Sequence, residues 1–167
     1  MKYSLKPVID QNSKVLILGT MPGDESLRLG QYYANPRNQF WTILSRIYEE
    51  PVGENYCTKL AFLQQKGLAL WDVLRQANRE GSLDRHIKDP VPNDIHMLFH
   101  SYPSLRLIAF NGSKAEKLFY RWIFIDLDCE YQRAMKFIRL PSTSPVPGKY
   151  NPSLEDKIER WKIIKTF

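Results

Sequence analysis

The chain has 167 residues, about the size of one domain, and its 43% hydrophobic and 25% charged side chains are typical of a globular protein. This composition excludes a disordered chain, a collagen and a coiled coil. No apolar run approaches the roughly 18–20 residues of a transmembrane helix, and no signal peptide is visible. Cys57 and Cys129 lack metal-ligand spacing. We therefore expect a single domain over residues 1–167, in the cytoplasm, with no membrane partner.

The net charge is +6, with a pI of about 9.3. Residues 131–167 contain eight basic and three acidic side chains, a net charge of +5, so this region holds most of the excess. A basic region on a globular chain indicates a polyanionic partner such as nucleic acid, although a solvated charged face is the alternative.

The first half of the chain predicts two strands and two helices. Lys14–Gly19 is a short run of branched apolar residues that ends in glycine, which is typical of a buried parallel strand. Asn38–Glu49 has apolar residues at helical spacing. Asn55–Gln65 predicts a second helix that ends before Gly67, and Leu68–Leu74 predicts a second buried strand.

The second half continues this alternation. Ala77–Asp89 is polar and predicts a loop. A helix is expected from Pro92 to about Ser101, and Leu105–Phe110 predicts a third strand. Ser113–Trp122 predicts another helix, and Lys136–Leu140 a fourth strand.

A last helix is expected to begin near Pro152, with Asn151 or Ser153 as its cap. Strands that alternate with helices predict an α/β fold, a three-layer α/β/α sandwich around a central, mainly parallel four-stranded sheet. Ligands of such folds bind beyond the carboxyl ends of the strands. The segments expected there are residues 19–37, 72–79, 111–114 and 141–151.

The segment after the first strand is long and polar. It reads G-T-M-P-G (Gly19–Gly23) and then Q-Y-Y-A-N-P-R-N-Q-F-W (Gln31–Trp41). It has neither the glycine spacing of dinucleotide-binding loops nor the Gly-Lys-Ser/Thr of phosphate-binding loops. Adjacent tyrosines and amides fit recognition of a flat polar ring, which an aromatic face stacks on and amides pair with. The alternative is that these residues cap the core and form turns.

These residues resemble motif 1 of the uracil-DNA glycosylase superfamily, and L-P-S-T-S-P (Leu140–Pro145) resembles its motif 2. A-L-W-D-V-L (Ala69–Leu74) and I-A-F-N-G-S-K-A (Ile108–Ala115) resemble the DNA-deoxyinosine (hypoxanthine) glycosylase branch. The resemblance covers about Val15 to Trp161. It implies a monofunctional DNA glycosylase of base excision repair that hydrolyses the N-glycosidic bond of a deaminated base, hypoxanthine first and uracil second. It also implies damaged DNA as partner, no cofactor and no metal, and we expect a monomer.

The resemblance further implies the site residues. In the mismatch-specific relatives the third position of motif 1 is an asparagine that orients the attacking water, and here it is Met21. The catalytic role then passes to Asn38, whose alternative role is to cap the helix that starts near Gln39. Tyr33 is expected to stack on the flipped base. The base-binding set is Gly19, Thr20, Met21, Pro22, Gly23, Tyr33 and Asn111, and the DNA-binding set is Ser142, Thr143, Ser144, Pro145 and Lys149.

Three questions stay open on the sequence. Asp72, at the end of the second strand, is either a general base or a partner of the neighbouring backbone. Pro145, Val146 and Pro147 could supply an apolar wedge that fills the vacated position in the base stack. Met21 also leaves a second reading of the whole chain, a non-catalytic nucleic-acid-binding module that keeps the glycosylase fold.

Overall fold

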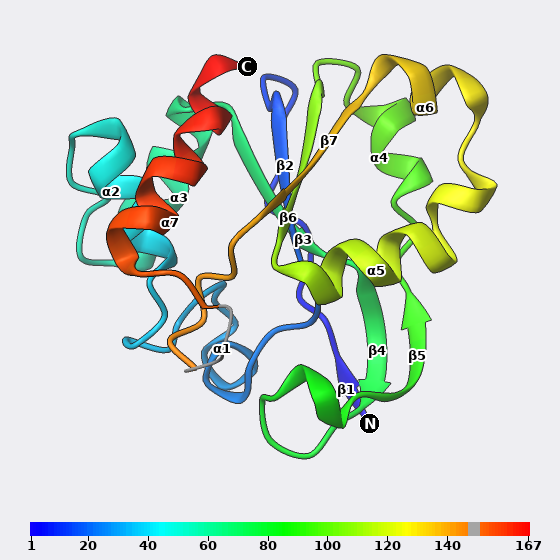
Figure 1. The fold of residues 1–167 in the computed structure, drawn as a ribbon, viewed down its shortest axis with the longest axis horizontal. Coiled ribbons are helices and arrows are strands. Elements are labelled where there is room, and N and C mark those ends of the chain that lie inside the picture. Colours follow the sequence, from blue (N-terminus) through cyan, green and yellow to red (C-terminus); the bar gives the residue numbers. More distant parts are fainter. Residues whose placement is uncertain (147–150) are drawn as a thin grey trace.

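The centre of the molecule is a four-stranded sheet in which all neighbouring strands are parallel (Figure 1). The structure, a computed structural model, describes residues 1–146 and 151–167. The strand order is β3-β2-β6-β7, with β2 at Val15–Gly19, β3 at Leu68–Asp72, β6 at Leu107–Asn111 and β7 at Lys136–Leu140. Every residue of β2 and β3 is buried, as expected for apolar strands covered on both faces. The predicted central sheet is confirmed.

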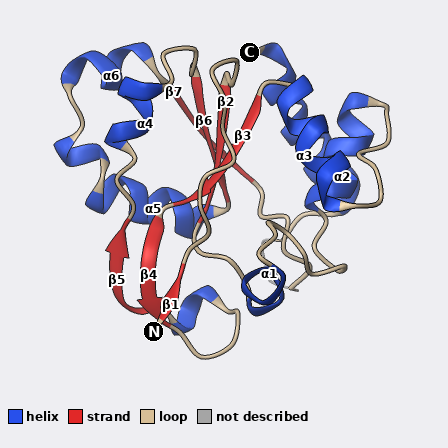
Figure 2. Ribbon diagram, turned by 180° about the vertical axis from the view of Figure 1, so that it is seen from behind, coloured by secondary structure: helices blue, strands red, loops and turns tan. Residues whose placement is uncertain are grey.

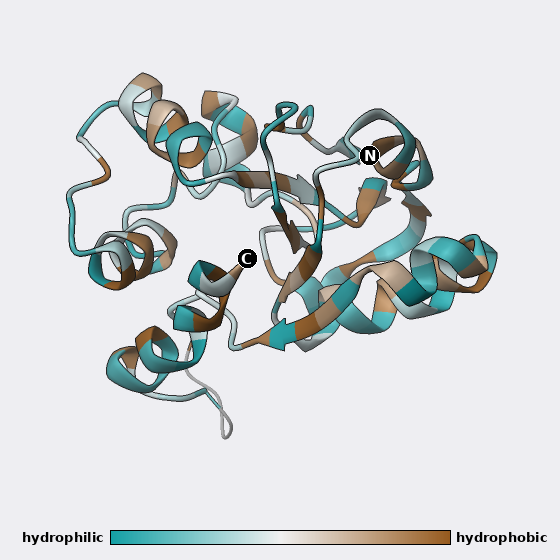
Figure 3. Cartoon of the chain, turned by 90° about the horizontal axis from the view of Figure 1, so that it is seen from above, coloured by the Kyte–Doolittle hydropathy of each residue, from teal (hydrophilic) through white to brown (hydrophobic). Residues whose placement is uncertain are grey.

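Helices cover both faces of this sheet (Figures 1 and 2). One side has α2 (Phe40–Tyr48), α3 (Tyr56–Gln65) and α7 (Leu154–Trp161), and the other has α4 (His96–Ser101), α5 (Ser113–Trp122) and α6 (Cys129–Ala134). The helices carry both hydrophobic and hydrophilic residues (Figure 3), as helices that pack one face on a core do. The expected three-layer α/β/α sandwich is therefore confirmed.

The caps of two helices follow the sequence. Ser153 is one of the two predicted caps of α7. Its hydroxyl accepts a hydrogen bond from the Asp156 amide at the start of the helix. The Asn55 side chain accepts from the Thr58 amide and begins α3.

A second, antiparallel sheet lies beside the first. It has the order β1-β4-β5, with β1 at Lys2–Tyr3, β4 at Leu74–Asn78 and β5 at Lys88–Pro92. The expectation of a loop over Ala77–Asp89 was therefore wrong at both ends of that segment. Register shifts interrupt the β4–β5 pairing, so the apolar alternation that marks a strand is absent from the sequence.

Several short elements were also not predicted. They are α1 (Asp24–Leu29) and the 3-10 turns η1 (Asp84–His86), η2 (Phe124–Asp126) and η3 (Lys162–Thr166), besides α6. Each has six residues or fewer, too few to show a helical period. In the described part of the chain, no helix has the length and hydropathy that crossing a bilayer would need.

Candidate active site

A cavity of about 1060 Å³ opens at the carboxyl ends of the four parallel strands. This volume is slightly above the roughly 300–1,000 Å³ usual for ligand pockets. Its lining comes from the loops after all four strands and from the segment of residues 82–84. Asn38 and all seven residues of the predicted base-binding set line it, as do Ser142, Thr143, Ser144 and Pro145. Lys149 lies outside the described residues. The described members of the predicted sets therefore line one cavity.

Tyr33 forms part of the cavity wall. Its ring stacks on the buried ring of Phe40, with centroids 3.8 Å apart and planes 17° apart. Its backbone has φ 53°, a left-handed conformation that is strained for a tyrosine. Burial and the nearby Asp72 carboxyl raise the pKa of the Tyr33 hydroxyl, which stays protonated. Tyr33 is partly exposed and lines the cavity.

The Asn38 side chain lies both at the start of α2 and at the cavity. Its Oδ1 accepts a hydrogen bond from the Phe40 amide at 3.0 Å, which stabilises the first turn of α2. Gln39, the residue immediately before α2, makes no side-chain hydrogen bond that caps the helix. The Asn38 Nδ2 has no acceptor among the residues that the structure describes, and the side chain is half-buried at the cavity. The carbonyl end thus fixes the side chain and leaves the amide as a free donor.

Asn111, at the end of β6, joins the two motifs. Its Nδ2 donates to the Tyr33 hydroxyl at 3.1 Å and to Thr143 Oγ1 at 3.0 Å. Its Oδ1 accepts from the Thr143 amide at 2.9 Å. Both donors of the Asn111 amide are therefore used inside the protein, and only one lone pair of Oδ1 remains for a base.

The loop after β7 contains partly exposed hydroxyl side chains and an exposed apolar residue. The Ser142 hydroxyl accepts from the Ser144 amide, and the Ser144 hydroxyl accepts from the Val146 amide. Both serines are half-buried, and Val146 is 51% exposed. Thr143 differs from them because it is buried and its carbonyl accepts from the Gln39 amide. The loop thus offers Ser142, Ser144 and Val146 to a partner.

Asp72 is a further group of the cavity that the sequence marked only by its position after a buried strand. Its Oδ2 accepts from the Ser4 hydroxyl at 3.1 Å, and the side chain is almost fully buried at the cavity wall. Burial raises the pKa of Asp72 to about 7, with the Ser4 hydrogen bond opposing the shift. Near neutral pH a substantial fraction of this carboxyl is therefore a neutral acid.

A glycine is required at position 19 because the Asp72 carboxyl approaches its backbone closely. A Cβ on Gly19 would lie 2.6 Å from Asp72 Oδ1 and 3.6 Å from the Tyr33 hydroxyl. Since real Cβ atoms do not approach so closely, any other residue would displace the carboxyl or the loop. The glycine therefore brings the two polar groups of the cavity wall together.

The basic C-terminal region divides between the cavity and the interior. Arg139 and Arg160 line the cavity, and Arg139 also pairs with Glu116 at 3.3 Å. Lys157 is buried instead, with its Nζ donating to Gln39 Oε1 at 2.8 Å and to a loop carbonyl. Desolvation lowers the pKa of Lys157. The charge excess therefore does not form a single solvated face.

Among the described residues, no group of three or more histidine, cysteine, aspartate or glutamate side chains is placed to hold a metal ion.

Comparisons of the sequence and of the fold with known proteins point to one family. The family model of the uracil DNA glycosylase superfamily matches residues 7–166. A protein named hypoxanthine DNA glycosylase from Methanosarcina barkeri is 43% identical over 115 residues, which cover 68% of this chain and 73% of that protein. One of the same name from Methanosarcina acetivorans is 44% identical over 119 residues, with the same two shares. A solution NMR structure from Methanosarcina acetivorans, provisionally named a uracil DNA glycosylase, has a TM-score of 0.81 and 33% identity, covering 98% of this chain and 96% of that one.

Proposed function

Because the chain belongs to the uracil DNA glycosylase superfamily, we propose that it is a DNA glycosylase that excises hypoxanthine by hydrolysing the N-glycosidic bond of deoxyinosine. The names of its two Methanosarcina relatives support this substrate. Uracil is the secondary substrate in this proposal. Cys57 and Cys129 are free and exposed, which fits a reducing compartment, and we place a monomeric enzyme of base excision repair in the cytoplasm.

The observation that carries the proposal is one cavity that joins an aromatic platform to polar groups at its edge. A target base must leave the duplex before an enzyme can reach its glycosidic bond. The Tyr33 ring offers the flipped base a stacking surface, and Asn38 and Asp72 line the same cavity. Hypoxanthine is flat and presents carbonyl and ring-nitrogen acceptors, so it matches this combination.

Catalysis requires stabilisation of the negative charge that grows on the departing base. Preorganised donors in a site shielded from water supply this stabilisation. The free Nδ2 of Asn38 is one such donor, held in place because Oδ1 is bound to the Phe40 amide. The second lone pair of that oxygen is available to a water molecule that attacks the anomeric carbon.

Asp72 supplies a second donor when it is protonated. An ionised carboxylate would repel the negative charge on the base, whereas a neutral acid donates a hydrogen bond to it. The Oδ2 atom is held by Ser4, and Oδ1 has no donor among the described residues. The raised pKa, about 7, keeps the acid form available at neutral pH.

The loop after β7 and the surrounding cations hold the DNA strand in this proposal. The hydroxyls of Ser142 and Ser144 suit phosphate oxygens, and Arg160 adds charge at the same cavity. Val146 is exposed beside them and fits the role of the wedge that replaces the extruded base. The product is an abasic site in an intact strand.

The test is an excision assay on oligonucleotides that carry hypoxanthine, uracil, xanthine or a G·T mismatch, followed by alkaline cleavage of abasic sites. We expect the fastest product formation with hypoxanthine. Product from none of the four, together with retained DNA binding, would support the non-catalytic binding module instead.

A further inference from the structure

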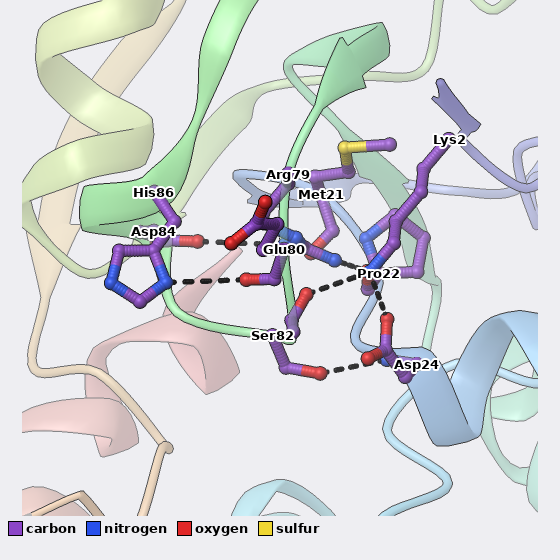
Figure 4. A network of polar contacts seen from close by, with 10 residues as sticks. Lys2, Met21, Pro22, Asp24, Arg79, Glu80, Ser82, Asp84 and His86 are labelled. Atoms are coloured by element: carbon purple, nitrogen blue, oxygen red, sulfur yellow. Dashed lines mark hydrogen bonds and ion pairs between the residues drawn. The ribbon is translucent and has the colours of Figure 1, made fainter.

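Behind the motif 1 loop lies a buried arginine from the small antiparallel sheet. Arg79 follows β4, and its side chain has no exposed surface. Its guanidinium donates to the carbonyl of Met21 at 3.4 Å and to the carbonyl of Pro22 (Figure 4). Arg79 does not line the cavity, so it is not placed to contact DNA.

Residues 81 and 82, which follow Arg79, connect the end of the same loop to β1. The Ser82 hydroxyl accepts from the Asp24 amide at 2.8 Å. Lys2 of β1 donates to the Gly81 carbonyl at 2.8 Å and pairs with the Asp24 carboxylate (Figure 4). The small sheet and residues 79–82 therefore contact the motif 1 loop and the first residue of α1.

Stability alone does not explain a buried guanidinium at this place. Its nearest carboxylate, Asp84, is 3.8 Å away, and its Nε has no partner among the described residues. Removing a charged group from water is costly, and apolar residues of similar volume commonly replace buried ion pairs without loss of stability. What an apolar residue cannot do is bind two successive carbonyls and fix their directions.

The direction of those carbonyls decides where a backbone donor points. The peptide bond is planar, and in its trans form the C=O and N–H groups point in opposite directions. With the Pro22 carbonyl turned toward Arg79, the Gly23 amide points away from Arg79. No acceptor for this amide is found within the described residues, and Gly23 lines the cavity.

We propose that Arg79 is a positioning residue that orients the Pro22–Gly23 peptide so that the Gly23 amide donates to the flipped nucleotide whose base is excised. The inference rests on the proposed glycosylase function and adds a backbone donor to it. Arg79 acts through the loop and never touches the substrate. A preorganised donor acts in the transition state, so its loss slows chemistry more than it weakens binding.

The test compares Arg79→Met with Arg75→Met, which removes an exposed arginine from the same sheet. Single-turnover excision of hypoxanthine and the Kd for undamaged duplex are measured for both. We expect Arg79→Met to slow excision by about 10²-fold, in line with the loss of one preorganised donor, with the Kd within about twofold of wild type. Arg75→Met is expected to leave the excision rate unchanged.

Arg79→Lys keeps the charge but not the two-armed guanidinium, so it tests the geometry when the methionine variant does not fold. We expect it to fold and to excise about tenfold more slowly, as an intermediate case. A folded Arg79→Lys or Arg79→Met with the wild-type excision rate would overturn the inference, as would equal losses in rate and DNA affinity. Failure of the wild-type protein to excise any base would instead overturn the proposed function.

Discussion

The two sides of the cavity are built differently. The base side, formed by Gly19–Gly23, Tyr33, Asn38 and Asp72, is largely buried and is fixed by long-range contacts, including those of Arg79. The DNA side, formed by Ser142–Val146, is more exposed, and its hydroxyls bond mainly to amides two residues away. Under the proposed function, the base side binds the flipped base and acts in chemistry, and the DNA side binds the strand.

The largest effect is expected at Asn38. Asn38→Ala removes one preorganised donor and should slow single-turnover excision by about 10²–10³-fold. Because it also removes a helix-capping group, it should lower the free energy of unfolding by about 0.5–2 kcal/mol. Asn38→Asp keeps the acceptor for the Phe40 amide and so the melting temperature, but it loses the donor and the activity. A wild-type excision rate in Asn38→Asp would show that donation to the base is not its task.

A second way to disrupt the base side is to fill the space at Gly19. Gly19→Ala should displace the Asp72 carboxyl, and an error of about 1 Å in a site typically costs about 10²-fold in rate. A wild-type excision rate in Gly19→Ala would mean that the Gly19–Asp72 approach has no part in excision.

Tyr33 tests whether the aromatic platform binds the base. Tyr33→Ala should weaken binding to a hypoxanthine-containing duplex by about 1–3 kcal/mol and leave binding to undamaged duplex almost unchanged. Tyr33→Phe keeps the ring and loses only the bond to Asn111, so its effect should be mild. If Tyr33→Ala unfolds the protein, as circular dichroism would reveal, the residue belongs to the core.

The pH profile sharpens the assignment of Asp72. If the neutral acid is the active form, excision falls about tenfold per pH unit above about pH 7, the raised pKa of this carboxyl. The charged groups near the Asp72 carboxyl are Asp84 and Arg79. Tyr32 and Tyr33 also lie near it and are protonated, hence neutral. Asp72→Asn keeps a donor and should flatten the profile. A rate that rises through pH 7 would identify a general base instead.

The same pKa has a consequence for stability. The ordinary aspartate pKa is 3.8 and that of the folded state about 7, so between these values the native state binds more protons than the unfolded state. The contribution of Asp72 to stability therefore falls as the pH rises through that window. In urea unfolding, the stability of Asp72→Asn should depend less on pH between these two values than that of the wild-type protein.

The smallest effect is expected from single cations of the DNA side. Arg160→Gln should reduce the slope of log Kd against log salt concentration by about 1, if Arg160 contacts a phosphate. Arg46→Gln is the control, because Arg46 pairs with Glu155 and does not line the cavity. An unchanged slope in Arg160→Gln would mean that its charge serves only solubility.

The sequence predicted the central sheet and most of the helices that cover it, because short apolar runs and helical periods mark them directly. The resemblance to the glycosylase motifs also indicated Asn38, Tyr33 and Asn111 as site residues, and all three line one cavity. The sequence could not predict the small sheet, whose β4 and β5 pair with register shifts. Nor could it predict Arg79, since a buried arginine bound to backbone carbonyls has no local sequence signal.

Product analysis of the wild-type protein on a deoxyinosine-containing duplex, with and without sodium borohydride, tests the central claim most directly. Hydrolysis by water predicts free hypoxanthine in amounts equal to an intact abasic strand, and no protein–DNA adduct after reduction. Release of no hypoxanthine would contradict the glycosylase assignment, and a trapped adduct would contradict hydrolysis without a lysine nucleophile.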